Sequence, residues 1–589
     1  MPFIARHVLR LSFLAGSLLF AIGCASIPGA PASPQQQADV ASADALYHQG
    51  DFQGAANAYL DLAEKNRSLR DAMLLQAAES WRQENAWDRV TPLLEEIHAR
   101  RLTPDEAQHF TVLRAEAALA DDNPRRAIEL TLGSAQMYPA WRIRALEARA
   151  RAEAANGQAF DAARTRIALG SELEGYDRSQ NEAQILAVLG NLDATRLNAE
   201  GSGLTNDDPL KPWIAQALAK QGGALAMNLP QLDSPVGTLL PGSTREGYQP
   251  PHHVALLLPL GGPLAAAANA VRDGFLTLQQ TDPEAAAMHV EIIDSGDSVA
   301  SALAAYQQAV ESGADMAVGP LSSAAVDALF QRSELPLPVL ALNHPDEGLP
   351  PSGSAEFSMP PEAEGAQVAA RMRAQGLDSA VVFVADAGWA QRAARAFRAQ
   401  FESLGGHVPA SAILDTERVN YADIIGQALA TVDSNSGIFM AVAAEQGRLL
   451  VPQLRIAQVT QPLFATSHIY GADDDAGLDR DLDGVEFCDA PWLFNAQAGL
   501  PRRADLAGTM ATASGPAARL FAFGMDAYAL LPYLGWLREH PRSYLAGATG
   551  QLTMDSFGRV MRTPIWARFV NGIAQPSSGS LELDPAATP

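Results

Sequence analysis

The carboxy-terminal half of the chain alternates between short apolar runs and segments with the periodicity of a helix. It begins with Val254–Leu258, a continuous apolar run that is typical of a strand buried on both faces of a parallel sheet. Turn residues follow at 259–263, and apolar positions then recur every three or four residues from Leu264 to Leu278. This order predicts the first half of a βαβ unit, whose ligand side is the carboxyl end of the strand.

The same alternation continues beyond this unit. The pattern predicts further strands at residues 290–294, 316–319, 338–343, 380–385, 408–414, 437–442 and 463–465. Helices are expected between them at residues 299–312, 323–331, 390–404, 421–431 and 445–456, with another that follows Pro360 and ends at 375. Pro360 separates two consecutive runs of βα units, which predict two parallel sheets in two lobes with a cleft between them.

The amino-terminal half, residues 41–228, favours helix throughout because it is rich in alanine, leucine, glutamate and arginine. Four similar turns recur at steps of roughly 35 to 37 residues, close to the tetratricopeptide period. They lie at Gly50–Ala55, Asn85–Val90, Asp122–Ala127 and Gln158–Ala163. We expect a tetratricopeptide-like superhelix with a concave face for a peptide or protein, and a non-repeating helical bundle is the alternative. The Gly/Pro-rich residues 229–251 then form a linker.

The first 40 residues carry the pattern of a secretion signal followed by a tether. Basic residues precede an apolar run that ends at Gly23, is too short to span a bilayer, and predicts a signal peptide over residues 1–23. Cys24 follows Ala-Ile-Gly, which resembles a bacterial lipobox, so we expect acyl chains such as palmitate on Cys24. Ala25 in place of aspartate implies sorting to the outer membrane. An ordinary signal peptide with an incidental cysteine is the alternative, and residues 24–40 are a Pro/Ser/Gln-rich tether.

Composition narrows the choice of partners. The net charge is −25 and the chain has only three lysines, which argues against nucleic acid or an anionic membrane surface and favours a basic partner. The two cysteines, Cys24 and Cys488, cannot form a zinc site of the CxxC type. Cys488 lies on an expected strand, so we interpret it as a small core residue rather than a reactive thiol.

The motifs of enzymes and metal sites are incomplete. Asp479, Asp481, Asp483 and Gly484 copy the first half of a calcium loop, but position twelve is Ala490 instead of glutamate. We interpret this stretch as a solvated acidic loop, with weak cation binding as the alternative. The sequence contains no HExxH zinc motif, no phosphate-binding GxxxxGK[ST] loop, and no nucleophile elbow at its Gly-Asp-Ser motif. We therefore expect no catalytic residues, no metal site and no cofactor.

Several short motifs resemble a known family. Pro259–Pro263, Gly296-Asp297, Gly313–Asp315 and Val318–Ser322 resemble the type I periplasmic-binding-protein fold over residues 252–575, with a tail at 576–589. Together with the lipobox and the helical half, the chain resembles the LpoA family of outer-membrane lipoproteins that activate penicillin-binding proteins. The further motifs that match this family are Leu482–Trp492, Phe523–Tyr528 and Gly550–Asp555. The fold class is thus α plus α/β.

The resemblance implies a regulator rather than an enzyme. The protein would contact a class A penicillin-binding protein through its carboxy-terminal domain and stimulate peptidoglycan synthesis, and peptidoglycan itself is a further candidate contact. The expected cleft residues are Ser322, Ser323, Asn343 and Asp386. Ser322 and Ser323 lie at an expected helix amino terminus, where they would hold a carboxylate, or else only cap the helix. A lipid-anchored receptor for an amino acid or wall fragment is the alternative function.

Overall fold

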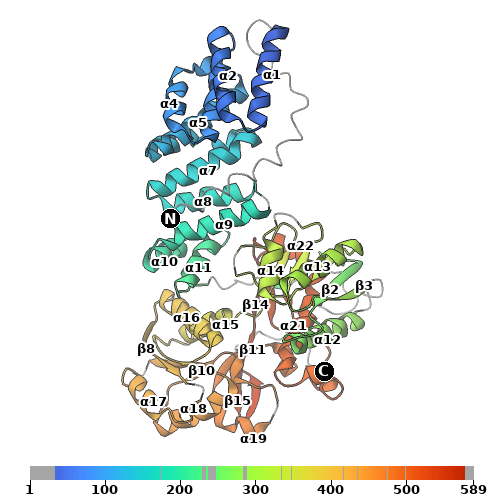
Figure 1. The fold of residues 1–589 in the computed structure, drawn as a ribbon. Coiled ribbons are helices and arrows are strands. Elements are labelled where there is room, and N and C mark those ends of the chain that lie inside the picture. The colour runs from blue at the N-terminus through green and yellow to red at the C-terminus, as the bar shows by residue number, and fades with distance from the viewer. Residues whose placement is uncertain are drawn as a thin grey trace. The chain divides into compact units, whose positions relative to one another are not determined.

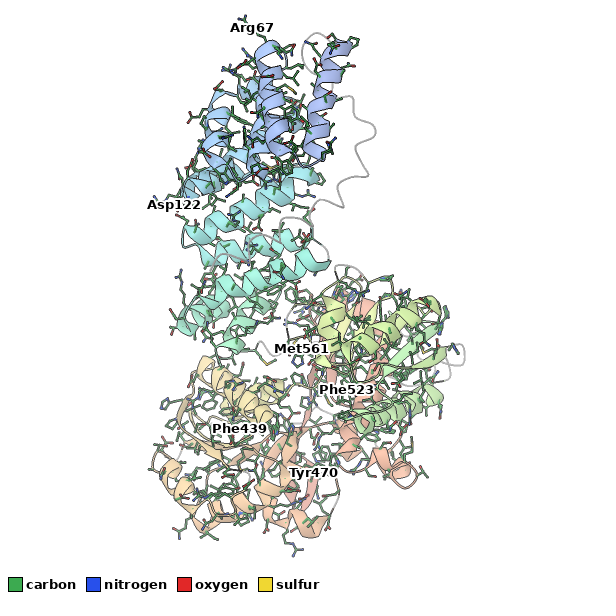
Figure 2. All side chains as sticks on the ribbon, in the orientation of Figure 1. Arg67, Asp122, Phe439, Tyr470, Phe523 and Met561 are labelled. Carbon is green, nitrogen blue, oxygen red and sulfur yellow. The ribbon has the colours of Figure 1, made fainter. Side chains whose placement is uncertain are left out.

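The computed structural model describes residues 33–173, 175–227, 234–235, 247–282, 288–332, 335–346, 348–415, 417–433, 435–473, 475–497 and 499–577. The chain forms two compact units, residues 1–172 and residues 173–589. The expected signal peptide, Cys24, the first part of the tether and most of the expected linker and tail lie outside the described residues. Figures 1 and 2 show the ribbon and its side chains.

The first unit is a series of helical hairpins. Each expected turn joins two helices, as the tetratricopeptide-like pattern predicts, and the antiparallel pairs pack through alanine, leucine and aromatic side chains such as Tyr59, Leu75 and Trp81. The helices are α1 (Pro34–His48), α2 (Phe52–Lys65), α3 (Arg70–Gln83), α4 (Trp87–Glu96), α5 (Pro104–Ala120), α6 (Pro124–Thr131), α7 (Pro139–Ala155) and α8 (Ala159–Gly170).

The first helix begins inside the segment that we expected to be a tether. Helix α1 begins at Pro34 because Ser33 forms a capping box: its hydroxyl accepts from the backbone N–H of Gln36, and the Gln36 side chain accepts from the backbone N–H of Ser33. The Pro/Ser/Gln composition that suggests a flexible tether therefore also contains a helix start signal, since proline is favoured in the first turn.

The second unit begins with three helices that we assigned to the helical half. They are α9 (Gly175–Gly190), α10 (Ala194–Gly203) and α11 (Lys211–Lys220). They belong with the carboxy-terminal unit, because the amide of Gln216 donates to the carbonyl oxygen of Gly348 at 3.2 Å and the backbone N–H of Met227 donates to the Gln400 side chain at 2.7 Å. The helical region is therefore divided between the two units after residue 172.

The rest of the second unit has two sheets, each in its own lobe (Figure 1). Lobe 1 has the order β1-β12-β13-β14-β6-β5-β4-β2-β3, and lobe 2 has the order β16-β15-β11-β10-β9-β7-β8. The lobe 1 strands are β1 (Ser234–Pro235), β2 (His253–Leu258), β3 (His289–Asp294), β4 (Met316–Val318), β5 (Val339–Ala341), β6 (Ala355–Phe357), β12 (Ser543–Ala546), β13 (Gln551–Met554) and β14 (Arg559–Thr563). The lobe 2 strands are β7 (Ser379–Ala385), β8 (His407–Leu414), β9 (Ser436–Ala441), β10 (Leu463–Ala465), β11 (Glu486–Asp489), β15 (Ile565–Val570) and β16 (Ile573–Pro576).

The expected strands and helices up to residue 465 are present to within three residues at each end, and β6 is an additional strand that the pattern did not predict. The prediction of purely parallel sheets was wrong, because both sheets are mixed. Residues 543–576 return through both lobes. Strands β12, β13 and β14 pair antiparallel with one another and join the first sheet through the parallel pair β14–β6. Strands β15 and β16 extend the second sheet in antiparallel pairs. Short strands joined by tight turns pair antiparallel, whereas parallel neighbours need a crossover of a dozen residues or more.

Helices cover both sheets. They are α12 (Ala265–Thr281), α13 (Val299–Glu311), α14 (Ser323–Phe330), α15 (Pro361–Ala374), α16 (Gly388–Ser403), α17 (Ala422–Leu429), α18 (Ala444–Ile456), α19 (Ala476–Asp479), α20 (Arg503–Ala507), α21 (Ala517–Leu530) and α22 (Leu534–Glu539). Helices α12 and α21 approach closely through glycine: a Cβ on Gly274 would lie 1.9 Å from the carbonyl oxygen of Phe521, and one on Gly524 would lie 2.0 Å from that of Val271.

The helical stretch Ala517–Glu539 meets the length and hydropathy of a membrane span, but 83% of its most apolar window is buried inside the fold. It contributes Phe523, labelled in Figure 2, whose ring stacks on Phe357 with centroids 4.3 Å apart. This stretch is therefore a core helix of lobe 1, for which the same length and composition suffice.

Candidate functional site

Three of the four predicted cleft residues lie together on lobe 1. Ser322 is the N-cap residue of α14 and Ser323 is its first residue, and both side chains are half-buried. The amide of Asn343 donates to the carbonyl oxygen of Leu321 at 2.8 Å, which fixes the loop after β5 against the start of α14. The Ser322 hydroxyl makes no capping hydrogen bond, so simple helix capping does not account for it.

The turn before Ser322 depends on glycine. Gly319 has a φ of +108°, and a Cβ there would lie 2.2 Å from the carbonyl oxygen of Leu257 on the neighbouring strand. Only glycine fits both the backbone conformation and this close approach. The Gly-Pro-Leu-Ser motif found in the sequence therefore positions α14 against the carboxyl ends of β2 and β4.

The fourth predicted residue, Asp386, lies on lobe 2. It is exposed after β7, and its carboxylate accepts from the Gln391 amide of its own lobe at 3.2 Å. Sequence reasoning missed the aromatic pair next to it, where the ring of Trp389 at the start of α16 stacks on His468 after β10, with centroids 3.8 Å apart. Asp386 thus belongs to the lobe 2 side of the predicted cleft, and the Trp389–His468 pair is a further feature there.

Three chain segments connect the lobes, and buried charges join them. The segments run from β6 to α15, from β11 to α21, and from β14 to β15. Glu364 on α15 accepts from the guanidinium of Arg562 on β14, and from the backbone N–H and hydroxyl of Ser467 in lobe 2, each at 3.0 Å. Burial opposes ionisation of Glu364, but Arg562 and the hydrogen bonds from Ser467 hold its pKa below the ordinary value.

A second buried pair lies beside the first. The guanidinium of Arg519 on α21 donates to both carboxylate oxygens of Asp489 at the end of β11. It also donates to the carbonyl oxygens of Ser467 and Tyr470, at 2.8 and 2.7 Å. We call Glu364, Arg562, Asp489, Arg519 and Ser467 the crossover network, because its charged members lie on the three connecting segments.

The crossover network fixes the lobes relative to each other. Each carboxylate has an arginine partner, and removal of one member leaves a charge buried without its counterion. Glu364 and Asp489 lie on elements of lobe 2, and their arginine partners lie on elements of lobe 1. Opening or closing the lobes would therefore stretch these bonds. The arrangement therefore favours one lobe orientation over the hinge motion of a ligand-operated clamshell.

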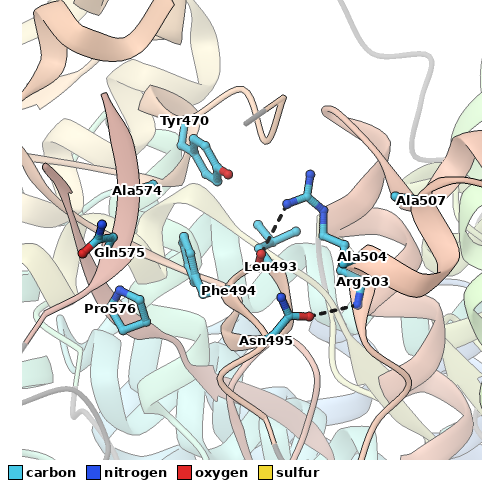
Figure 3. A pocket seen from close by; sticks show the side chains of 10 residues that line it. All are labelled: Tyr470, Leu493, Phe494, Asn495, Arg503, Ala504, Ala507, Ala574, Gln575 and Pro576. Atoms are coloured by element: carbon cyan, nitrogen blue, oxygen red, sulfur yellow. Dashed lines mark hydrogen bonds between the residues drawn. The ribbon is translucent and has the colours of Figure 1, made fainter. Parts of the chain in front are cut away.

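A pocket of about 300 Å³ lies at the edge of lobe 2 (Figure 3). Its lining mixes aromatic, aliphatic and polar side chains, and consists of Tyr470, Leu493, Phe494, Asn495, Arg503, Ala504, Ala507, Ala574, Gln575 and Pro576. The guanidinium of the buried Arg503 donates to the carbonyl oxygens of Leu493 and Ala513 and to that of Ala472. Arg503 therefore forms a charged wall whose position is fixed by the backbone.

The acidic loop around Asp479 is only partly exposed to solvent. Asp479 is buried and lies 2.8 Å from the guanidinium of Arg448, so the prediction of a fully solvated loop was wrong at this position, although Asp481 is exposed. Within the described residues, no group of three or more His, Cys, Asp and Glu side chains is arranged to hold a metal ion. Cys488 is fully buried in the core of lobe 2, as expected.

The comparisons with known proteins place this architecture in a family. The model of the family described as "LppC putative lipoprotein" matches residues 51–239 and 247–572. The chain is similar to the "Penicillin-binding protein activator LpoA" of Vibrio antiquarius, with 23% identity over 87% of this chain and 92% of that protein. It is similar to the protein of the same name from Photobacterium profundum, with 25% identity over 94% of this chain and 96% of that protein.

Among solved structures, the chain is similar to the crystal structure of full-length LpoA from Haemophilus influenzae, with 19% identity over 89% of this chain and 97% of that chain, and a TM-score of 0.48. The family model covers nearly all of the hairpins of the first unit and both lobes of the second. The chain belongs to the LppC putative lipoprotein family.

Proposed function

We propose that this protein is an outer-membrane lipoprotein that activates a class A penicillin-binding protein by direct contact. The observation that carries the proposal is the extent of the similarity. Relatives named "Penicillin-binding protein activator LpoA" align over 87 to 94% of this chain and over 92 to 96% of their own length. The alignments thus extend over the helical unit and both lobes, which supports a shared activity rather than a shared domain.

The crossover network supports an activator over an enzyme or a hinged receptor. A partner shifts a synthase toward its active conformation only if it binds that conformation more tightly, and a rigid surface does this better than a flexible one. The acidic net charge of −25 favours a basic docking partner. A lipid anchor on Cys24 would hold the protein at the outer membrane, and the carboxy-terminal domain would contact the synthase.

The test uses the chain from Ala25 onward, without the acyl anchor, and the periplasmic part of the class A synthase of the same organism. We expect saturable binding at micromolar affinity or better, and faster crosslinking of lipid II. Binding without any change in the crosslinking rate would contradict the activator role. In cells, Cys24→Ala should move the protein from the membrane fraction to the periplasm, and an unchanged membrane fraction would contradict acylation.

One observation favours a second function. The half-buried hydroxyl of Ser322 makes no capping bond at the amino terminus of α14, where a carboxylate would find free backbone N–H groups. If the protein is a small-ligand receptor, a free amino acid or a wall peptide should raise its melting temperature. The substitution Ser322→Ala should abolish that rise. Crosslinking activity that does not change in the presence of such ligands would separate the two functions.

A further inference from the structure

The edge of the lobe 2 sheet next to the pocket has the features of a peptide-binding surface. In the described part of the chain, β16 is the last strand of this sheet and pairs with β15. Its first residue, Ile573, is 51% exposed, and its next three residues line the pocket. An edge strand with exposed apolar side chains is a template for pairing with another chain.

The acidic loop lies against the same edge. The turn between β15 and β16 packs on α19, because a Cβ on Gly572 would lie 2.1 Å from the carbonyl oxygen of Ala476. The backbone N–H of Gly572 also donates to the carboxylate of Asp483 at 2.7 Å. These contacts place Leu478, which is 49% exposed on α19, beside the hairpin that carries Ile573. The pocket and α19 therefore both lie against the hairpin formed by β15 and β16.

The charges on this surface select the partner. Asp473 and Asp479 are paired with Arg448, whereas Asp475 and Asp481 are exposed to solvent. The exposed Arg480 lies next to Asp481 and offsets one of these charges, so the rim keeps a net negative charge that favours a basic segment. Inside the pocket, Arg503 and Asn495 contribute to the lining beside the rings of Tyr470 and Phe494. An uncharged side chain would pack against the rings of Tyr470 and Phe494, whose centroids are 5.8 Å apart.

We infer that this surface, formed by Leu478, Ile573 and the pocket between Tyr470, Phe494 and Ala507, docks an extended, basic segment of the penicillin-binding protein. The segment pairs with β16 and inserts one apolar or aromatic side chain into the pocket, with its basic residues toward Asp475 and Asp481. This inference rests on the proposed function, since it names the surface through which the activator contacts the synthase. Strand addition supplies affinity through the backbone, and the pocket supplies specificity.

The test compares three variants of the full chain in binding to the periplasmic part of the synthase. Ile573→Lys places a cation on the edge strand, and Ala507→Phe fills the pocket while leaving Arg503 in place. The matched control is Ile292→Lys, which changes an isoleucine that is 39% exposed on β3, the edge strand of the other sheet. We expect the first two variants to weaken the Kd by about tenfold or more, the loss typical of an anchor residue, and the control to bind like the wild type.

Site-specific photo-crosslinking gives the second readout. A photoreactive residue at position 573 should crosslink to the synthase, and one at position 292 should not. A crosslink from position 573 to a second copy of this chain, or within the same chain, would overturn the inference. Unchanged melting temperatures confirm that Ile573→Lys and Ala507→Phe are folded, and a variant that melts early is replaced by Leu478→Lys.

The outcomes separate this inference from the proposed function. If the wild type binds and activates the synthase while all three variants behave like it, the docking surface is wrong and the proposed function stands. If the wild type neither binds nor activates, the proposed function fails and the docking surface fails with it. Raising the salt concentration should slow association of the wild type more than that of Asp475→Asn/Asp481→Asn, because the exposed acidic rim steers a basic segment. An equal effect on both proteins would overturn the role of the rim.

Discussion

Each unit contains a network of two carboxylates and two arginines, and the two networks join different kinds of segments. In the first unit, Glu79 and Glu116 accept from Arg82 and Arg144, so that helices α3, α5 and α7 are joined. Glu79 also accepts from the ring of His109 at 2.8 Å. We call these five residues the hairpin network. It joins consecutive repeats, so it specifies how each hairpin stacks on the next.

The crossover network of the second unit joins segments that are much further apart in the sequence. Glu364 and Arg562 are separated by 198 positions, whereas the bonds of the hairpin network span 65 positions or fewer. The surroundings differ as well: the side chain of Arg562 is 5% exposed and that of Arg144 is 22% exposed. The Glu364–Arg562 pair of the crossover network is therefore dry, whereas both arginines of the hairpin network border on water. Arg519 of the crossover network lies between these extremes, with 16% of its side chain exposed.

This difference shows how the same residue types can serve two purposes. A charge pair at the border of water loses little on being separated, because solvent and neighbouring partners compensate. A pair in a dry interior is costly to break, because each charge left behind has no solvent. We expect the hairpin network to tolerate substitution better than the crossover network, and the crossover network to fix one arrangement of the lobes.

The largest effect should follow from Glu364→Gln. The substitution leaves Arg562 buried without a counterion and removes the acceptor of the Ser467 N–H, so we expect a loss of about 3–5 kcal/mol in the free energy of unfolding. Urea unfolding would measure this loss, and hydrogen exchange by mass spectrometry would assign it to the second unit. The control is Arg502→Gln, which breaks the exposed Arg502–Asp505 pair and should cost less than about 0.5 kcal/mol. A loss of under 1 kcal/mol for Glu364→Gln would mean that the crossover network does not hold the lobes.

The free energies of unfolding of the two units should also change with pH in opposite directions. Burial raises the pKa of Glu356 on β6 from 4.5 to about 8, with Arg559 opposing the shift, and one of its carboxylate oxygens has no hydrogen-bond partner among the described residues. The folded state then holds a proton that the unfolded chain releases, so this contribution is present below about pH 4.5 and is lost as the pH rises to about 8. Burial also opposes ionisation of Glu79, but Arg144 and His109 hold its pKa down at about 2, so its contribution is present at neutral pH and lost as the pH falls from 4.5 toward 2.

The variant Glu356→Gln tests the first of these signs. A neutral amide removes the cost of ionising a buried carboxyl, so at pH 8.5 we expect the variant to be more stable than the wild type by on the order of 2–4 kcal/mol, at about 1.4 kcal/mol per pKa unit. Below pH 5 the difference should vanish. Urea unfolding at several pH values measures it. A wild type whose second unit becomes more stable between pH 5 and pH 8, relative to the variant, would contradict the assignment.

The sequence predicts the elements of both units much better than it predicts these networks. The strands and helices up to residue 465 follow from apolar periodicity, because each has a buried face of regular spacing. The four hairpin turns follow from small residues and aromatic residues at fixed steps. The strands after residue 543 were missed because no helices alternate with them, and the alternation with helices is what identified equally short strands such as β4 and β10.

The site residues divide in the same way. Ser322, Ser323 and Asn343 lie at strand ends that the alternation of βα units predicts, so their grouping on lobe 1 could be anticipated. Glu364, Arg519 and Arg562 could not, since nothing local shows that three positions up to 198 residues apart meet. Asp489 lies within a motif that carried the family resemblance, yet the motif alone did not indicate its arginine partner. Buried long-range pairs leave no periodic signal, and they become visible only in the fold.

A smaller loss should follow from Glu79→Gln in the hairpin network. Glu116 remains as a carboxylate partner for both arginines, and their guanidinium groups reach water, so we expect a loss of about 2 kcal/mol, below that of Glu364→Gln. Hydrogen exchange should show the change in α3, α5 and α7 and leave the lobes unaffected. Equal losses for Glu79→Gln and Glu364→Gln would remove the distinction between the two networks.

The smallest loss of stability should follow from removing a helix cap, and it should be the same in both units. Thr103 before α5 and Ser298 before α13 form the same capping box: the hydroxyl accepts from the third N–H of the helix, and the side chain of that third residue accepts from the N–H of the cap. Replacing either cap with alanine should cost about 1 kcal/mol, because the bond is local and depends only on the helix end. A much larger loss of stability for Ser298→Ala than for Thr103→Ala would mean that the second unit is more sensitive to substitution in general. The contrast between the two networks would then reflect the lobes as a whole rather than the burial of the Glu364–Arg562 pair.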